Sequence, residues 1–268
     1  MNENDEDYSI KNKPSGWDKM PLCEKIKFTA PRLHRGFAKY IDKILAKDLV
    51  KRQYGNIVEI PKTIRILKDH NDLFENDLNY NHIIKSSHGC SWNYNIQPDI
   101  NYQIEQIRSK LQEWNKLYNP INEKQYSYLE PRFFIEEKID DKYYGKNGDA
   151  LSYLIRCIHG IPYTFTMRAK HLKAELQYLF DTNKKLVNIP NSVGSKKLNI
   201  DIRLISEETI EKMYSVASQM SSNFEFVRID LYLDKNDKII FNEFTFTPLG
   251  GGINYDMEIE LTLGKLWK

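Results

Sequence analysis

The stretch FEFVRIDLYLDKNDKIIFNEFTFTP, residues 224–248, decides the fold of the chain. It has two runs rich in aromatic and β-branched residues on either side of the polar segment 235–237, a pattern that predicts an antiparallel hairpin with a tight turn. Each run carries one acid in its interior, Asp230 and Glu243, and pairing about the turn brings the two acids to roughly opposite positions. We therefore expect a sheet that presents two carboxylates on one face.

Two neighbouring carboxylates repel each other unless a cation lies between them. Their oxygens suit Mg²⁺, which commonly takes one or two protein carboxylates and completes its shell with nucleotide phosphates. Two other arrangements stay open: the strands can offset the two acids, or each acid can pair with a nearby Lys or Arg. Arg228 shares a strand face with Asp230. There it can form a structural ion pair, or hold a phosphate or an oxyanion by bidentate hydrogen bonds.

The end of the second run combines aromatic residues with a proline and three glycines. Strand alternation puts Phe241 on the face of Glu243, and Phe244 and Phe246 on the other face. This predicts apolar packing on both faces, which makes an unpaired Glu243 costly and a bound cation more plausible. The small residues of segment 248–252 are expected to let backbone amides approach a ligand closely.

Composition excludes some classes of function. Lys and Arg number 39 against 37 Asp and Glu, a charge of +2 that implies neither nucleic acid nor an anionic membrane as partner. The 17 tyrosines and 12 phenylalanines could stack on bases, but no basic stripe accompanies them. Three widely spaced cysteines predict reduced thiols. Residues 1–16 lack a signal peptide's apolar region, and no stretch approaches the roughly 20 apolar residues of a membrane span. We expect a cytoplasmic protein without a transmembrane segment.

The remaining pattern mixes helices with hairpins, which favours an α+β fold over a doubly wound sheet. Helical periodicity extends over residues 36–54, 100–117 and 207–220, and Ser206 is a candidate N-cap of the last helix. Strands are predicted at 56–61, 82–89 and 130–139, and a hairpin at 151–169 with its turn at His159, Gly160 and Pro162.

Several charged residues outside the hairpin are ambiguous by themselves. Lys85 closes an apolar strand before a glycine-containing loop, where it can reach a phosphate with the help of loop amides, or simply extend from a sheet edge into solvent. Lys47 falls on the solvated face of a predicted helix. Glu136 and Glu137 end a strand, where they can bind the amino group or hydroxyls of a nucleotide, or face solvent.

Taken together in this order, four blocks resemble the ATP-grasp superfamily, and within it the TupA-like proteins of bacterial surface-polysaccharide biosynthesis. The blocks are DKILAKDLV (42–50), HIIKSSHGCS (82–91), FFIEEKI (133–139) and the hairpin 224–248. The resemblance covers about residues 28–268 and implies an α+β ATP-grasp fold, in which two α+β subdomains grip ATP, with a short N-terminal extension. The implied divisions are a partly disordered arm (1–27), an N-terminal helix and preceding segment (28–80), a small subdomain with phosphate flap and hinge (81–140), and a large subdomain with the metal-binding hairpin (141–268).

The resemblance also implies the site, with ATP and Mg²⁺ as cofactors. Nucleotide contacts are implied for Lys47, Lys85, Ser87, His88, Gly89, Glu136, Glu137, Ile139 and Arg168. Mg²⁺ ligands are implied for Asp230, Glu243 and Thr245, and catalytic roles for Arg228 and Lys85. Two positions depart from the superfamily. Thr245 stands where an amide ligand is common, and Leu154 stands where the family often has a lysine, so that Arg156 or Arg168 is the candidate for the missing charge.

The implied activity is a carboxylate–amine ligase that forms an amide through an acylphosphate. The implied partner is a small molecule or glycan precursor, in which a uronic acid or amino acid supplies the carboxylate. Phosphoryl transfer needs charge neutralisation rather than a covalent nucleophile, and the chain shows no Ser/His/Asp or Cys/His arrangement. Two other functions stay open: a sugar kinase of the same fold, and a non-catalytic or glycosyltransferase-like binding protein of polysaccharide biosynthesis.

Overall fold

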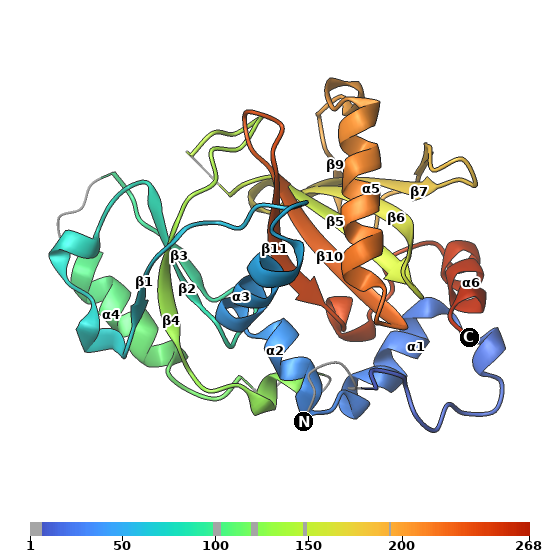
Figure 1. Cartoon of the computed structure of the whole chain (residues 1–268), viewed down its shortest axis with the longest axis horizontal. Coiled ribbons are helices and arrows are strands. Elements are labelled where there is room, and N and C mark those ends of the chain that lie inside the picture. Colours follow the sequence, from blue (N-terminus) through green and yellow to red (C-terminus); the bar gives the residue numbers. More distant parts are fainter. Residues whose placement is uncertain (1–6, 99–102, 119–122, 147–148, 193) are drawn as a thin grey trace.

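The computed structural model describes residues 7–98, 103–118, 123–146, 149–192 and 194–268. It contains a four-stranded sheet of order β1-β4-β2-β3 and a seven-stranded sheet of order β11-β10-β5-β6-β7-β8, with β9 paired to β7 (Figure 1). All neighbouring strands pair antiparallel except β7 and β9. The α+β prediction is confirmed.

The small sheet consists of β1 (Thr63–Leu67), β4 (Phe133–Glu137), β2 (His82–Ser86) and β3 (Asn93–Asn95). Helix α4 (Gln103–Trp114) buries Ile107 and Leu111 against this sheet. The helix predicted at 100–117 is thus confirmed over 103–114, whereas residues 100–102 lie outside the described residues. The predicted boundary between residues 80 and 81 assigns β1 and β4 to different segments, although these two strands pair with each other.

The large sheet is built from the two predicted hairpins and three further strands. Its strands are β5 (Ser152–Ile158), β6 (Ile161–Ala169), β7 (Ala174–Phe180), β8 (Leu186–Ile189), β9 (Lys196–Lys197), β10 (Phe226–Leu233) and β11 (Ile239–Thr245). The turn between β5 and β6 consists of His159 and Gly160, both at positive φ. Pro162 was expected in this turn but lies in β6, where it pairs with Cys157.

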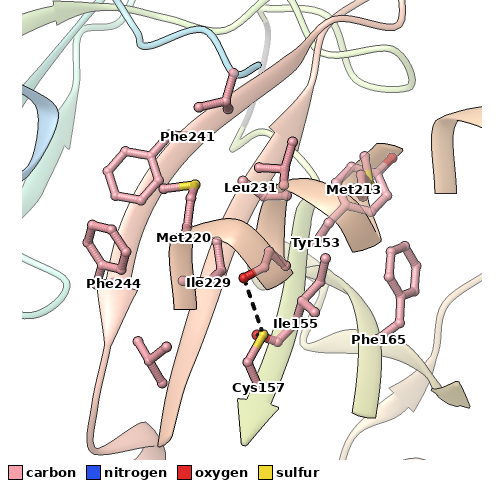
Figure 2. Close-up of a cluster of buried hydrophobic side chains, with 14 of the residues drawn as sticks. Tyr153, Ile155, Cys157, Phe165, Met213, Met220, Ile229, Leu231, Phe241 and Phe244 are labelled. Atoms are coloured by element: carbon pink, nitrogen blue, oxygen red, sulfur yellow. Dashed lines mark hydrogen bonds between the residues drawn. The ribbon is translucent and has the colours of Figure 1, made fainter. Parts of the chain in front are cut away.

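Helix α5 (Glu207–Ser221) covers one face of the large sheet (Figure 1). The Ser206 Oγ accepts a hydrogen bond from the Thr209 N–H at 3.1 Å, which confirms the predicted N-cap. Met213 and Met220 of α5 reach the core of the sheet, and Figure 2 shows them beside the strand residues of β10 and β11.

The helix predicted over 36–54 is broken in two, α2 (Ala38–Ile41) and α3 (Lys43–Tyr54). Asp42 between them is extended, and its Oδ1 accepts hydrogen bonds from the N–H groups of Ile44 and Leu45. An aspartate in this role starts a helix, because its side chain satisfies amides that have no partner within the helix. The strand predicted at 56–61 does not form. Only Glu59 pairs with the large sheet, through an isolated bridge to Ile240.

The N- and C-terminal segments pack together at the far end of the large sheet. Helix α1 (Leu22–Thr29) lies against α6 (Met257–Leu266), and both contribute to one apolar cluster with Trp17 and Trp267. The buried Lys25 ammonium donates to the carbonyls of Gly264, at 2.7 Å, and Trp267. Residues 7–27 therefore contain packed structure, while residues 1–6 lie outside the described residues.

Short 3₁₀ helices connect the larger elements. They are η1 (Trp17–Lys19), η2 (Ala30–Arg32), η3 (Arg35–Phe37), η4 (His70–Asp72), η5 (Glu75–Asp77), η6 (Lys124–Tyr128), η7 (Lys170–Leu172), η8 (Ile202–Leu204) and η9 (Pro248–Gly251). Within the part of the chain that the structure describes, no helix combines the length and apolar character needed to cross a membrane.

Strand β11 contains a β-bulge that changes the predicted orientation of its side chains. Asp230 pairs with Glu243, but the next residue of β10, Leu231, pairs with Phe241, so Asn242 is extra. The bulge reverses the alternation. Phe241 and Phe244 consequently share one face, with ring centroids 4.9 Å apart, in the same core as α5 (Figure 2). The predictions that Phe241 shares a face with Glu243, and that β11 has apolar packing on both faces, are wrong.

Candidate active site

A cavity of about 400 Å³ is lined by residues of both sheets. Nine of the thirteen residues singled out from the sequence line it: Lys85, Glu136, Glu137, Ile139, Arg168, Arg228, Asp230, Glu243 and Thr245. The small sheet thus contributes Lys85 and the end of β4, and the large sheet contributes the carboxylate hairpin. Segments more than 100 residues apart in the chain meet here because the two sheets face one cavity.

The carboxylate hairpin forms one wall. Asp230 and Glu243, predicted at roughly opposite positions, are directly paired on β10 and β11 because of the bulge; the register near the turn, continued without it, would place Asn242 opposite Asp230. Arg228 donates from Nε to Asp230 Oδ1 at 2.6 Å and from Nη2 to Oδ2 at 2.5 Å. Burial raises the pKa of Asp230 to about 6, although Arg228 opposes this shift. Of the two alternatives that the sequence left open, an offset of the two acids is excluded by their direct pairing, whereas pairing with a nearby cation holds for Asp230 and Arg228.

Thr245 is tied to this arginine as well. Its Oγ1 accepts a hydrogen bond from Arg228 Nη2 at 3.1 Å. Arg228 is therefore held on two sides, by Asp230 of its own strand and by Thr245 of β11, with its side chain only about 10 % exposed. A guanidinium fixed in this way presents its planar donor edge in a set direction, which suits recognition of a phosphate or an oxyanion.

On the small sheet, one carboxylate bridges two lysines. Glu136 is almost fully buried and accepts a hydrogen bond through Oε1 from Lys85 Nζ at 2.5 Å, while its Oε2 pairs with Lys47 Nζ. Burial lowers the pKa of Lys85 to about 8 and lowers the pKa of Lys47 as well. Lys85 keeps its proton at pH 7 and therefore presents an ammonium group to the cavity beside Glu136. This part of the site favours an anion.

Lys47 therefore lies behind the cavity wall, because it is buried and does not line the cavity itself. The helix face predicted to be solvated at this position is covered by β4, where the Lys47 ammonium lies 4.5 Å from the ring centroid of Phe134. Its contact with Glu136 joins α3 to the small sheet.

The predicted flap residues are buried and hydrogen-bonded within the protein. Ser87 Oγ donates to Asp42 Oδ2 at 3.0 Å. The His88 ring nitrogens lie 2.8 Å from Ser86 Oγ and 3.0 Å from the Trp114 carbonyl oxygen, and burial lowers the pKa of His88. A Cβ on Gly89 would lie 2.5 Å from the Trp92 ring. Ser87, His88 and Gly89 shape the loop but do not line the cavity, which meets the following residues instead: Cys90, Ser91 and Trp92.

Lys43 is a cavity residue that sequence reasoning missed. Its Nζ donates to the Gly89 carbonyl at 2.6 Å and lies 3.9 Å from Glu243 Oε2. It links the start of α3, the loop after β2 and the carboxylate hairpin. The signal was present in the sequence, because an aspartate N-cap at position 42 places residue 43 at the first position of the helix. The nucleotide contact was assigned instead to Lys47, four residues later in the same helix.

One glycine of the run packs against helix α1, and another lines the cavity. Gly251 has a φ of +83°, and a Cβ there would lie 2.7 Å from the backbone nitrogen of Lys27 in α1. Pro248, Leu249 and Gly250 line the cavity, with Leu249 and Gly250 also at positive φ. A close approach was expected at all three glycines. At Gly251 the chain approaches helix α1.

Glu123 also lines the cavity and contacts the residue before this loop. Its Oε1 accepts a hydrogen bond from Thr247 Oγ1 at 2.9 Å, and that hydroxyl accepts one from Gln125 Nε2 at 2.7 Å. Burial raises the pKa of Glu123. Of the two arginines proposed for the missing charge near Leu154, Arg168 lines the cavity. Arg156 is buried against the Tyr255 hydroxyl and does not line it.

The oxygen atoms on the hairpin fit a magnesium ion. Among the residues described, no three His, Cys, Asp or Glu side chains converge as a metal site. Asp230 and Glu243 nevertheless offer carboxylate oxygens on a rigid strand pair at the cavity wall, and Mg²⁺ commonly binds through one or two protein carboxylates and takes its remaining ligands from water and substrate phosphates.

A family model, TupA-like ATPgrasp, matches residues 25–268. The chain belongs to the TupA-like ATP-grasp family. Among solved structures, D-alanine–D-alanine ligase from Helicobacter pylori is 14% identical over 94% of this chain and 70% of that one, with a TM-score of 0.51. This similarity supports the ATP-grasp fold predicted from the sequence.

Other solved structures are larger than this chain. VanG D-Ala:D-Ser ligase from Enterococcus faecalis is 16% identical over 86% of this chain and 61% of that one, with a TM-score of 0.47. A biotin carboxylase–β-γ-ATP complex from Campylobacter jejuni is 13% identical over 92% of this chain and 52% of that one, with a TM-score of 0.49. The chain thus spans between half and two thirds of the length of these two proteins. No sequence match was found among curated proteins.

Proposed function

We propose that the protein is an ATP- and Mg²⁺-dependent carboxylate–amine ligase. The observation that carries this proposal is that a carboxylate pair on the large sheet and a lysine-rich wall on the small sheet line the same cavity. Oxygen ligands for a cation and ammonium groups for phosphates are what phosphoryl transfer requires, because its transition state needs positioning and charge neutralisation. Membership of the ATP-grasp family supports the same conclusion.

In the proposed reaction, the γ-phosphoryl group of ATP moves to a substrate carboxylate oxygen, which breaks the bond to ADP and forms an acylphosphate. An amine nitrogen then attacks the acyl carbon, phosphate leaves, and the amine gives up a proton as the amide forms. Bound Mg²⁺ would neutralise phosphate charge in this sequence.

The residues divide between these tasks. Asp230 and Glu243 would hold the Mg²⁺, and Lys85 and Lys43 would bind phosphate oxygens from the other wall. Arg228, fixed by Asp230 and Thr245, would stabilise the oxyanion that develops on the acyl carbon.

The end of β4 is the proposed nucleotide hinge. Glu137 and Ile139 line the cavity there, beside Lys138, whose ammonium donates to the Ile96 carbonyl at 3.0 Å. Glu136 takes a different role from the one implied by resemblance, because it is committed to two lysines. We propose that it orients these lysines toward phosphate rather than contacting the base.

The proposed substrate is a precursor of a bacterial surface glycan such as a capsule or an O-antigen, with a uronic acid or an amino acid as the carboxylate donor. This finer assignment rests on the TupA-like resemblance. The mixed polar lining of the cavity, with Asn93, Asn95 and Ser152 beside charged groups, suits a hydroxyl-rich ligand.

The test is ADP release from Mg-ATP, screened over pairs of uronic acids, amino acids and amines, with the products identified by mass spectrometry. We expect ADP and phosphate to form only when both an acid and an amine are present, together with an amide product. Glu243→Gln should abolish turnover, while Glu113→Gln, an exposed position on α4, should not. A stable phosphoester formed without an amine would establish a kinase instead, and undiminished turnover by Glu243→Gln would refute the metal assignment.

A further inference from the structure

The bulge in β11 places a second polar side chain beside Glu243. Because Asn242 is the extra residue between the pairs Asp230–Glu243 and Leu231–Phe241, it departs from strict alternation. Asn242 and Glu243 are consecutive, yet both are half-buried and both line the cavity, while Phe241 and Phe244 on either side are buried in the core. The bulge thus lets two consecutive residues line the same cavity, which the alternation of a regular strand does not allow.

The side-chain amide of Asn242 is free to take a ligand. It has no hydrogen bond or ion pair with any residue in the described ranges. Placing an amide at a cavity wall without a protein partner leaves its carbonyl oxygen and amino group available to whatever occupies the cavity.

The neighbouring oxygens leave room for such a ligand. The carboxylate pair alone supplies few protein oxygens, and Mg²⁺ requires six oxygen ligands in near-octahedral geometry. The Thr245 hydroxyl already accepts a hydrogen bond from Arg228. An amide carbonyl is a stronger magnesium ligand than a hydroxyl.

We propose that Asn242 supplies the amide carbonyl oxygen to the Mg²⁺ held by Asp230 and Glu243. The bulge thereby places this amide immediately before Glu243 in the strand. Thr245 acts as a positioning residue that holds Arg228. This inference rests on the proposed function, since it assumes that a divalent cation binds at the hairpin.

Binding of Mn²⁺, the spin-active substitute for Mg²⁺, tests the proposal without relying on turnover. Electron paramagnetic resonance of free Mn²⁺ gives the Kd of the parent protein, with and without ADP, and of three variants: Asn242→Ala, Asn242→Asp and Thr245→Ala. We expect Asn242→Ala to weaken Mn²⁺ binding by roughly tenfold or more, as loss of a metal-site partner does. Asn242→Asp should bind Mn²⁺ more tightly than Asn242→Ala, because it restores an oxygen ligand. Thr245→Ala should keep the parent Kd for Mn²⁺.

Thermal unfolding checks that each variant folds, and Asn242→Ala should keep the parent Tm because the amide has no partner to lose. The proposal is overturned if Asn242→Ala binds Mn²⁺ like the parent, if Asn242→Asp binds no better than Asn242→Ala, or if Thr245→Ala loses as much affinity. Failure of the proposed function is a separate result, because the parent protein would then neither bind ADP nor turn over ATP. In that case the Kd for Mn²⁺ without nucleotide still compares the Asn242 variants with Thr245→Ala.

Discussion

Replacing Glu136 by Gln removes the carboxylate that two buried lysines share. Glu136 and Lys47 are each under 5 % exposed, and the Lys85 side chain is 11 % exposed, so water cannot take over the role of the lost charge. Breaking a buried ion pair by removing one partner costs about 3–5 kcal/mol, because the remaining charge is left buried without compensation. For a chain of this length, that corresponds to a fall in Tm of roughly 6–20 °C.

The pH dependence of the stability lost in Glu136→Gln provides a second measure of the contribution of Glu136. The folded-state pKa of Lys85 lies at about 8, below its ordinary value of 10.5. Between these values the unfolded chain binds more protons than the folded one, so this lysine makes stability rise with pH over that window. Without Glu136 both lysines lose their protons more readily in the folded state. The deficit of Glu136→Gln should therefore shrink between pH 7 and pH 10.

The neighbouring residue provides a matched control. Glu137 has a 42 % exposed side chain and lies 3.3 Å from Lys146, in a surface ion pair. Such pairs contribute about 0–1 kcal/mol, so Glu137→Gln should shift Tm by only a few degrees. Thermal and urea unfolding of both variants gives the comparison. If Glu136→Gln matches Glu137→Gln in stability at pH 7, Glu136 does not hold the two lysines together and the reasoning is refuted.

Three further changes test the fold and the cavity. Phe241→Ala should lower the free energy of unfolding by about 3–5 kcal/mol, measured by urea titration, because the ring is fully buried in the core; a loss below 1 kcal/mol would contradict the bulged register. Gly251→Ala should lower the free energy of unfolding by more than Gly194→Ala. Both glycines have positive φ, which costs an alanine about 1–2 kcal/mol, but only Gly251 also contacts the backbone of α1. Equal losses in the two variants would count against that contact. Lys43→Ala should weaken Mg-ADP binding roughly tenfold, or about 1.4 kcal/mol, in calorimetry, whereas Lys51→Ala on the exposed side of α3 should not; unchanged binding by Lys43→Ala would remove this lysine from the site.

The hairpin was predictable because its information is local. A polar turn between two apolar runs fixes which residues face each other near the turn, so Asp230 and Glu243 were expected at roughly opposite positions. Their direct pairing depends in addition on the bulge. The same holds for the N-cap at Ser206, which depends on one hydroxyl and the N–H group three residues on. The α+β class followed from the order of such local elements, and the ATP-grasp fold from the resemblance of four sequence blocks to that superfamily.

The bulge at Asn242 was not predictable from the alternation itself. The sequence FNEFTF alternates well enough to suggest a regular strand, and no glycine marks the irregularity. Burial of both Phe241 and Phe244 in one core decides the register instead, and that core is completed by α5 and by β5, of which β5 lies far away in the sequence. Tertiary packing overrode a pattern of period two.

Two other contacts were not predictable for the same reason. The role of Glu136 depends on lysines from two other segments, and the partner of Gly251 lies more than 200 residues away in α1. A single sequence does not reveal such pairings, because the residue types alone are equally compatible with solvent-facing acids and ligand-facing glycines. The break at Asp42 differs from these, since aspartate within a helical pattern is a recognisable N-cap. The same N-cap places Lys43 at the first position of helix α3, so the position of this lysine was predictable as well.

Magnesium-dependent nucleotide binding tests the central claim most directly. Calorimetric titration with a non-hydrolysable ATP analogue, with and without Mg²⁺, should be performed on the parent, on Glu243→Gln and on the exposed-site control Glu113→Gln. The account predicts that Mg²⁺ tightens nucleotide binding by at least roughly tenfold in the parent and the control, a gain of about 1.4 kcal/mol, and that Glu243→Gln loses this gain while retaining metal-free binding. An equal gain in Glu243→Gln, or no nucleotide binding by the parent, would contradict the account.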